Sequence, residues 1–294
     1  MEMAQLDALV AVVDEGSFDG AARRLHVTPS AVSQRIKALE SAAGAVLLRR
    51  ARPVVATELG TDYVRLARQV LAVVHESGLP GGTDGAPATA LPRVPLAING
   101  DSLNTWAMAA LARVADLAVF DVHREDQDHS AELLRSGEVM AAITTQARPV
   151  QGCAAVRLGV MRYRPYAVPA FVRRWFPEGV TPHALAHAPV IMFDRKDDLQ
   201  DRYMRERTGH TLEPPRHYIP STADYAQAIA HGLGWGLLPA EHSDPLLAEG
   251  RVEALEPDGH VDVELYWQQW SLRTPVLDAV ARAVRQAAAD ALLP

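Results

Sequence analysis

The chain has 294 residues, of which 48% are hydrophobic and 22% charged, and its formal net charge is −7. These values are ordinary for a globular protein and exclude a disordered, collagen-like or highly charged chain. No apolar stretch reaches the roughly 18 residues of a membrane helix, and the N-terminus lacks the basic start of a signal peptide. The single cysteine, Cys153, excludes an internal disulfide. Length and cysteine usage together predict about two domains in a cytoplasmic protein without a membrane partner.

Positive charge is concentrated in one short part of this acidic chain. Residues 20–52 contain seven bases and one acid, whereas residues 1–19 contain five acids and no base. A local charge of +6 indicates a surface for phosphates, although a solvated charged face has the same composition. The seven bases are Arg23, Arg24, Arg35, Lys37, Arg49, Arg50 and Arg52.

The N-terminal pattern predicts a helix-turn-helix unit. Apolar residues recur at helical spacing over residues 4–14, 18–25 and 29–43. Ser17 and Thr28 stand where the N-caps of the second and third helices belong, and Pro29 fits the first helical position. Three short helices with tight connections are typical of a helix-turn-helix.

A wing and a longer helix follow this unit. Residues 46–48 and 54–55 are apolar and flank an arginine-rich turn, which predicts two short strands. Residues 58–77 form a predicted helix whose apolar residues alternate four and three apart, a period that favours a dimer contact over packing on its own domain. Residues 78–95 contain four glycines and four prolines and predict a linker. The apolar residues of the helix are Leu59, Tyr63, Leu66, Val70 and Val73.

After the linker, predicted strands alternate with predicted helices. This alternation favours parallel sheets covered by helices, and its two successive blocks predict two lobes. The predicted strands are residues 94–99, 117–122, 139–144, 166–169, 190–193, 218–220 and 235–238. The predicted helices are residues 101–114, 129–136, 181–187, a helix from Leu199, and 222–231.

The third helix has two distinct faces on a helical projection. Val32, Ile36 and Leu39 form a buried stripe, and the opposite face carries short hydroxyls, an amide and one cation. Such groups read base edges in the major groove, whereas arginines of a wing contact the DNA backbone or minor groove. The predicted DNA-binding residues are Thr28, Pro29, Ser30, Ser33, Gln34, Arg35, Lys37, Arg49, Arg50, Arg52 and Thr57.

Two stretches resemble the DNA-binding domain of LysR-type transcriptional regulators. They are GSFDGAARRLHVTPSAVSQRIKALESAAG (16–44) and LLRRARPVVATELG (47–60), and the resemblance extends over nearly the whole chain. It implies an α/β protein with an N-terminal winged helix-turn-helix and a two-lobed effector domain like a type II periplasmic binding protein. The implied parts are a DNA-binding domain (1–57), a dimerising helix (58–77), a linker (78–93) and an effector domain (94–294), with lobes 94–161 plus 263–294 and 162–262.

The second half resembles one branch of this family, the lysine/arginine-responsive regulators of basic amino-acid export or synthesis. The resembling segments include LAINGDSLNTW (96–106), PVIMFDRKDDLQD (189–201) and PSTADYAQAIAHGLGWGLLP (220–239). The resemblance implies a double-stranded DNA operator, a lysine or arginine effector, a homodimer or homotetramer through the linker helix, and RNA polymerase as a further partner. No catalytic, cofactor or metal motif is present, so we expect no enzyme and no cofactor.

An amino-acid effector needs groups for its carboxylate, its ammonium and its side chain. Hydroxyls and amides at strand ends and helix starts suit the carboxylate, with Ser102 and Thr145 expected to hold it and Thr222 to close over it. Acids suit the cation, either Asp194 or the group Glu125, Asp126 and Asp128. The same residues also fit ordinary helix caps and solvated loop acids. The predicted effector-binding residues are Asp101, Ser102, Asp128, Thr144, Thr145, Asp194, Ser221 and Thr222.

Two other classes of protein share parts of this pattern. A solute-binding protein without a DNA function has two α/β lobes, but the missing signal peptide and the basic segment argue against it. A small α/β enzyme with a fused helical domain also fits the alternation, but the missing catalytic motifs argue against it. The sequence therefore favours a ligand-responsive DNA-binding regulator.

Overall fold

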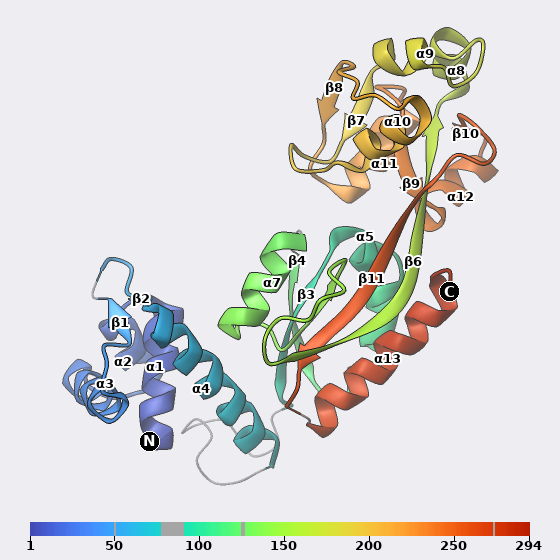
Figure 1. The fold of residues 1–294 in the computed structure, drawn as a ribbon. Coiled ribbons are helices and arrows are strands. Elements are labelled where there is room, and N and C mark those ends of the chain that lie inside the picture. The colour runs from blue at the N-terminus through green and yellow to red at the C-terminus, as the bar shows by residue number, and fades with distance from the viewer. Residues whose placement is uncertain (50, 78–90, 125–126, 273) are drawn as a thin grey trace. The chain divides into compact units, whose positions relative to one another are not determined.

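The computed structural model describes residues 1–49, 51–77, 91–124, 127–272 and 274–294 (Figure 1). The chain forms two compact units. The first unit comprises residues 1–99, 109–156 and 266–285, and the second comprises residues 100–108, 157–265 and 286–294. The domain and lobe boundaries drawn from the sequence stay a prediction.

The first unit begins with the predicted helix-turn-helix and wing. Its elements are α1 (Met3–Glu15), α2 (Phe18–Arg24), α3 (Pro29–Ala43), β1 (Leu48–Arg49), β2 (Val55–Ala56) and α4 (Glu58–Ser77) (Figure 1). Ser17 Oγ accepts a hydrogen bond from Gly20 N, and Thr28 Oγ1 accepts one from Ala31 N, so both predicted N-caps are confirmed. The strands of the wing are antiparallel and lie one residue later than the sequence predicted.

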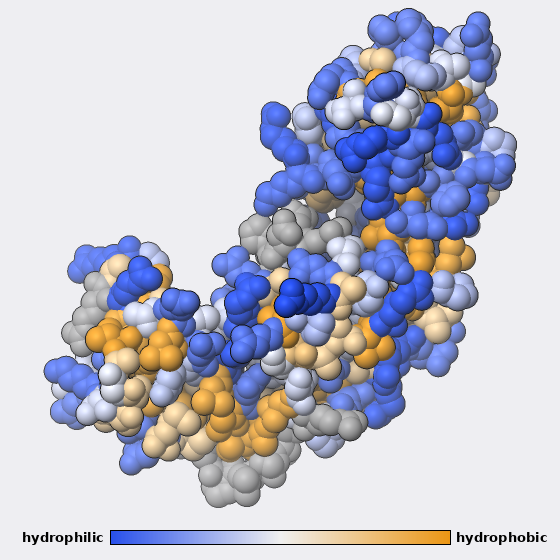
Figure 2. All heavy atoms as spheres, viewed as in Figure 1, coloured by the Kyte–Doolittle hydropathy of each residue, from blue (hydrophilic) through white to orange (hydrophobic). Residues whose placement is uncertain are grey.

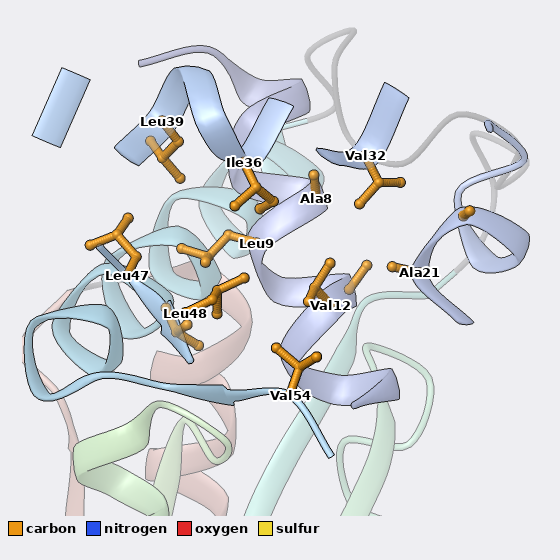
Figure 3. Packing of buried hydrophobic residues seen from close by; sticks show 13 residues of the cluster. Ala8, Leu9, Val12, Ala21, Val32, Ile36, Leu39, Leu47, Leu48 and Val54 are labelled. Carbon is orange, nitrogen blue, oxygen red and sulfur yellow. The ribbon is translucent and has the colours of Figure 1, made fainter. Parts of the chain in front are cut away.

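One buried cluster joins these helices to the wing (Figure 3). Leu9 and Val12 of α1 pack with Ile36 and Leu39 of α3, and Leu47 joins them from the start of the wing. Each of the five is at most 1% exposed. Burying side chains of this size stabilises a fold by about 1.5–3 kcal/mol each, so the cluster fixes α3 against α1.

The wing is held to both α3 and α4. Glu40 Oε1 accepts hydrogen bonds from Leu47 N at 2.9 Å and Leu48 N at 3.3 Å. Thr57 Oγ1 donates to the Leu47 carbonyl and accepts from Gly60 N, which caps α4. A Cβ atom at Gly60 would lie 1.9 Å from the Leu47 carbonyl oxygen, so this close approach requires glycine.

The apolar residues of α4 divide into two faces rather than the single stripe that the sequence predicted. Tyr63 and Val70 pack against the helices of the DNA-binding domain. Leu59, Leu66 and Val73 are between 37% and 42% exposed and recur every seven residues. The space-filling view shows apolar surface over the lower half of α4 (Figure 2). We call Leu59, Leu66 and Val73 the heptad stripe.

The rest of the first unit contains strands that pair in both directions. β3 (Arg93–Ile98) lies between β4 (Val119–Arg124) and β5 (Ala141–Thr144) and is parallel to both. β5 pairs antiparallel with the end of β11 (Val261–Trp270). The helices that follow β3 and β4 are α6 (Met108–Ala112) and α7 (Gln127–Ser136), and α13 (Pro275–Ala291) ends the helical part of the chain.

The second unit is built on the long strand β6 (Cys153–Ala167). β9 (Gly236–Pro239) and β10 (Glu253–Ala254) pair antiparallel with it, and β7 (Val190–Met192) is parallel to β8 (Arg216–Tyr218). Tyr166, Ile191, Tyr225, Ile229 and Leu238 belong to the core of this unit. Its helices include α8 (Pro169–Trp175), α9 (Pro182–His187), α10 (Leu199–Thr208), α11 (Thr222–Ala230) and α12 (Ala240–Ala248).

One prediction about this half was incomplete and one was wrong. The helix predicted over residues 101–114 is present over residues 100–112, but it consists of short α5 (Gly100–Ser102), a π-helical turn (Leu103–Ala107) and α6. The strand predicted at 166–169 is the end of β6, and the long antiparallel strands β6 and β11 make the main sheet mixed rather than parallel. Met161 and Tyr163 are buried and alternate with the less buried Arg162 and Arg164, a strand period that the prediction overlooked.

Candidate functional site

The exposed face of α3 carries the side chains that the sequence assigned to DNA. Ser30, Gln34 and Lys37 are exposed, and Ser33 is half-buried beside them. The opposite residues Val32, Ile36 and Leu39 are at most 1% exposed, which confirms the predicted division of the helix. The face therefore presents hydroxyl, amide and ammonium groups on a helix that is rigidly packed from behind.

Unpaired cations surround this face. Arg35, Lys37, Arg49 and Arg52 have no ion-pair partner among the residues that the structure describes, whereas Arg24 pairs with Asp14 at 2.8 Å. Arg49 and Arg52 are exposed in the wing, and Arg50 lies outside the described residues. Unpaired guanidinium and ammonium groups on one side of a small domain form a surface suited to phosphates. We call Arg35, Lys37, Arg49 and Arg52, together with Ser30, Ser33 and Gln34, the α3–wing surface.

Two of the predicted DNA-binding hydroxyls have structural roles. Thr28 Oγ1 caps α3, and Thr57 Oγ1 caps α4 while donating to the wing carbonyls. Thr57 is half-buried and its oxygen is engaged on both its donor and acceptor sides. We therefore leave Thr57 out of the α3–wing surface.

A half-buried carboxylate marks a second candidate site, which lies in the second unit. Asp101 is in the first turn of α5, and its Oδ2 accepts a hydrogen bond from the Tyr163 hydroxyl at 2.7 Å. Burial raises the pKa of Asp101, while the hydrogen bond from Tyr163 and the nearby His242 lower it in part. Asp101 has no ion-pair partner in the described part of the chain. A carboxylate removed from water without a counter-ion is costly, so this position suits a cationic ligand.

Buried hydroxyl and amide groups without partners belong to the same unit. Ser102 Oγ, Thr222 Oγ1 and Gln200 Oε1 have no hydrogen-bond partner among the described residues. Ser102 is 0% exposed, Thr222 4% and Gln200 1%. Leaving such groups unpaired costs about 1–3 kcal/mol each, and a polar ligand would satisfy them. We call Asp101, Ser102, Tyr163, Gln200 and Thr222 the buried polar cluster.

Asp194, the acid that the sequence assigned to the cation, also has a structural role. Asp194 is half-buried, and its Oδ1 accepts hydrogen bonds from Lys196 N at 2.7 Å and Asp197 N at 2.9 Å, so it closes the loop after β7. Asp197 is the acid with the raised pKa, which burial causes and which its bonds from Phe193 N and Leu199 N partly offset. Asp197 is also close enough to Asp101 for their charges to interact.

The other predicted effector residues have mixed surroundings. Ser221 Oγ lies 3.5 Å from Asp224 N at the start of α11, the place of an ordinary N-cap. In the first unit, Thr144 is 3% exposed and its Oγ1 accepts from Gln146 N, and Thr145 is half-buried. Asp128 lies in α7, but nothing is described of its side chain, and Glu125 and Asp126 lie outside the described residues.

Sequence reasoning missed Tyr163 and Gln200. Tyr163 is 5% exposed on β6, a strand that was not predicted, and Gln200 Nε2 donates to the Tyr225 hydroxyl at 2.6 Å. The alternation of buried Met161 and Tyr163 with the less buried Arg162 and Arg164 was the signal for Tyr163. Within the described ranges, no group of three potential metal ligands occurs, and none of the helices is long and apolar enough to cross a membrane.

Comparisons with known proteins agree with this arrangement. Residues 3–61 match the model of the bacterial regulatory helix-turn-helix protein, lysR family, and residues 96–289 match the LysR substrate binding domain. The HTH-type transcriptional regulator LysG of Mycobacterium tuberculosis is 44% identical over 285 residues, which cover 97% of this chain and 92% of that protein.

Corynebacterium glutamicum provides two further comparisons. Its lysine export transcriptional regulatory protein LysG is 39% identical over 299 residues, which cover 100% of both chains. The structure of full-length LysG from that organism with bound effector Arg has a TM-score of 0.81 and 38% identity, again over 100% of both chains.

A winged helix-turn-helix, a linker helix and an α/β domain with a buried polar cluster define a DNA-binding regulator with a small-molecule domain. The two family models together match most of the chain. This chain belongs to the LysR family of bacterial transcriptional regulators, a family of DNA-binding proteins rather than enzymes.

Proposed function

We propose that this regulator senses a basic amino acid, lysine or arginine, and controls genes for its export or metabolism. The single observation that carries the choice of effector is the half-buried carboxylate of Asp101, which has no ion-pair partner among the described residues. Support also comes from the Corynebacterium glutamicum relative, which is named for lysine export and was solved with arginine bound.

A cationic effector would offset the cost of holding the Asp101 carboxylate partly out of water without a counter-ion. The carboxylate is oriented by Tyr163, and no lysine or arginine of the described chain neutralises it. A ligand ammonium or guanidinium placed against it would form a charge-assisted hydrogen bond in a low-dielectric site. Asp197, which interacts electrostatically with Asp101, would contribute a second negative charge.

The ligand carboxylate needs donors, and the buried hydroxyls supply them. Ser102 and Thr222 are buried and unpartnered within the described residues, so their O–H groups are available to a carboxylate. Thr145 stays a predicted contact to the same group. With Asp194 engaged in its own loop, we assign it a smaller part than Asp101 in holding the cation.

The α3–wing surface would bind a double-stranded operator as part of a dimer. The heptad stripe has the seven-residue spacing by which helices pair in coiled coils, and 37–42% of each of its side chains is exposed. Two heads joined through α4 would place two copies of α3 on successive half-sites. Such a regulator acts on DNA in the cytoplasm, with RNA polymerase as its further partner.

Calorimetric titration of the full chain with lysine, arginine, glutamate and leucine tests the choice of effector. We expect saturable binding of lysine or arginine and none of glutamate or leucine. Tight binding of glutamate or leucine, with no heat from lysine or arginine, would contradict the basic effector. A gel-shift titrated with salt on the same preparation tests DNA binding independently, because that surface uses different residues.

A further inference from the structure

A pocket with two arginines lies in the first unit, among residues that no function described so far uses. Its volume is about 520 Å³, and it is formed by the last turn of α7 and the loop that joins β5 to β6. The lining residues, which we call the arginine pocket, are Arg135, Gln146, Arg148, Pro149, Val150 and Gln151. No acid belongs to this lining.

Both guanidinium groups of the pocket are available to a ligand. Arg135 and Arg148 are exposed, and neither guanidinium has an ion-pair or hydrogen-bond partner among the described residues. By contrast, two arginines of α4 are engaged in ion pairs. Arg65 pairs with Asp62, and Arg68 pairs with Asp14. Two unpaired cations beside two side-chain amides suit an anion with two charges and several acceptor oxygens.

The loop that carries Arg148 is fixed before any ligand binds. Gln268, which is 1% exposed, accepts a hydrogen bond from Val150 N at 3.0 Å. Its Nε2 donates to the carbonyls of Gln146 at 2.7 Å and Arg148 at 3.2 Å. Three bonds from one buried side chain hold the backbone of the pocket wall in place, so ligand binding need not order the loop.

The same walls hold the linker helix. Arg65 Nη1 of α4 donates to the Gln151 carbonyl at 3.2 Å, and Arg68 Nη1 donates to the Ser136 carbonyl at 3.1 Å. Gly137 permits this approach, because a Cβ atom there would lie 3.0 Å from Arg65 Cα. Gln151 therefore belongs both to the pocket lining and to the contact with α4, and Ser136, which also contacts α4, directly follows the lining residue Arg135.

From these observations we propose that the arginine pocket binds a small phosphate-bearing anion. The charge of the two guanidinium groups matches a phosphate dianion, and the volume accommodates more than a single phosphate group. The site is separate from the buried polar cluster, which belongs to the second unit. Through its rim it adjoins the contacts of α4, so an occupant would act on the linker helix without touching the effector residues.

Titration of the full chain with inorganic pyrophosphate at constant ionic strength tests the site. We expect saturable binding that weakens about tenfold or more in Arg148→Gln and in Arg135→Gln. Arg205→Gln is the matched control, because Arg205 is also exposed and without an ion pair in the described chain but lies in α10 of the second unit. An unchanged thermal midpoint in each variant shows that the fold is intact.

Four results would overturn the proposal or its choice of ligand. The first is no saturable binding to the unsubstituted chain, and the second is equal binding in Arg148→Gln, Arg135→Gln and Arg205→Gln. The third is binding that survives in Arg148→Gln but is lost in Arg49→Gln, which would assign the anion to the α3–wing surface. Stronger binding of succinate than of pyrophosphate would overturn the choice of phosphate. None of these results depends on whether lysine or arginine binds.

Discussion

The α3–wing surface and the buried polar cluster present polar groups in opposite ways. On α3, Gln34 and Lys37 are solvated and cost the free protein nothing, because the apolar core lies behind them. In the cluster, Ser102 is fully buried and Asp101 is half-buried before any ligand is present. The first arrangement suits a large, highly charged partner whose binding is dominated by phosphates, and the second suits a small ligand that must be selected by its charge.

The largest effect is expected at Asp101, where removal of the charge should weaken effector binding while raising the stability of the fold. Asp101→Asn should weaken lysine or arginine binding by about 2–5 kcal/mol, because the ligand cation loses its buried partner. The same change should raise the free energy of unfolding at pH 7 by up to about 1 kcal/mol, since a half-buried charge without a counter-ion is removed. Calorimetry and thermal unfolding measure the two quantities.

Asp194→Asn is the matched control for that substitution. The carboxylate of Asp194 accepts backbone hydrogen bonds within its own loop. Asp194→Asn should therefore lose less affinity than Asp101→Asn and should not gain stability. Equal losses of affinity in both variants would remove the distinction between the two acids. A lower stability of Asp101→Asn would show that the carboxylate is already satisfied in the free protein.

A smaller but specific effect is expected at Gln34 on the solvated face of α3. Gln34→Ala should cost about 1–3 kcal/mol on the operator and little on random duplex, because only the operator offers the base edge that the amide reads. Quantitative gel-shifts on the two duplexes measure this. Equal losses on both duplexes would assign Gln34 to a role without sequence specificity.

Acidification should weaken effector binding without any substitution. The pKa of Asp101 is raised by burial, and Tyr163, His242 and Asp197 are the titratable groups that interact with it. A cation binds the ionised form, so effector affinity should be constant above this pKa and fall by up to about tenfold per pH unit below it. Calorimetry across acidic pH checks the slope, and Asp101→Asn should abolish it.

The smallest effect is expected at the wing. Arg49→Gln should weaken DNA binding equally on operator and random duplex and lower the slope of affinity against salt by about one unit, because one phosphate contact is lost. Salt-titrated gel-shifts with both duplexes measure this. A loss confined to the operator would show that Arg49 reads a base.

The sequence predicted the DNA-binding head well because every signal in it is local. Ser17, Thr28 and Gly44 act within a few residues of the helix ends that they define, and the faces of α3 follow from helical period alone. The candidate effector site depends on contacts distant in sequence, such as Tyr163 with Asp101. Ser102 and Thr222 were found because they begin helices, but no local pattern distinguishes Asp197, whose pKa is raised, from Asp194 in the same loop.

The long strand β6 shows a different limit. Its arginines read as surface residues, and Arg162 is paired with Asp262 of β11 through bonds of 2.7 and 2.8 Å. Only the pairing of the two strands explains why charged residues interrupt an otherwise apolar strand. The prediction of a purely parallel sheet failed for the same reason, since alternation of strands and helices carries no information on these two crossing strands.

The attachment of the wing to both neighbouring helices leaves the head without an internal hinge. Glu40 ties the wing to α3, Thr57 ties it to α4, and Gly60 brings the α4 backbone against the Leu47 carbonyl. A rotation of α4 about its own axis is therefore transmitted directly through the wing to α3. In the proposed dimer, one residue inserted into α4 after Thr61 would rotate Leu66 and Val73 by about 100° relative to Leu59 and the wing, and it would also turn Tyr63 and Val70 out of their contacts with the head.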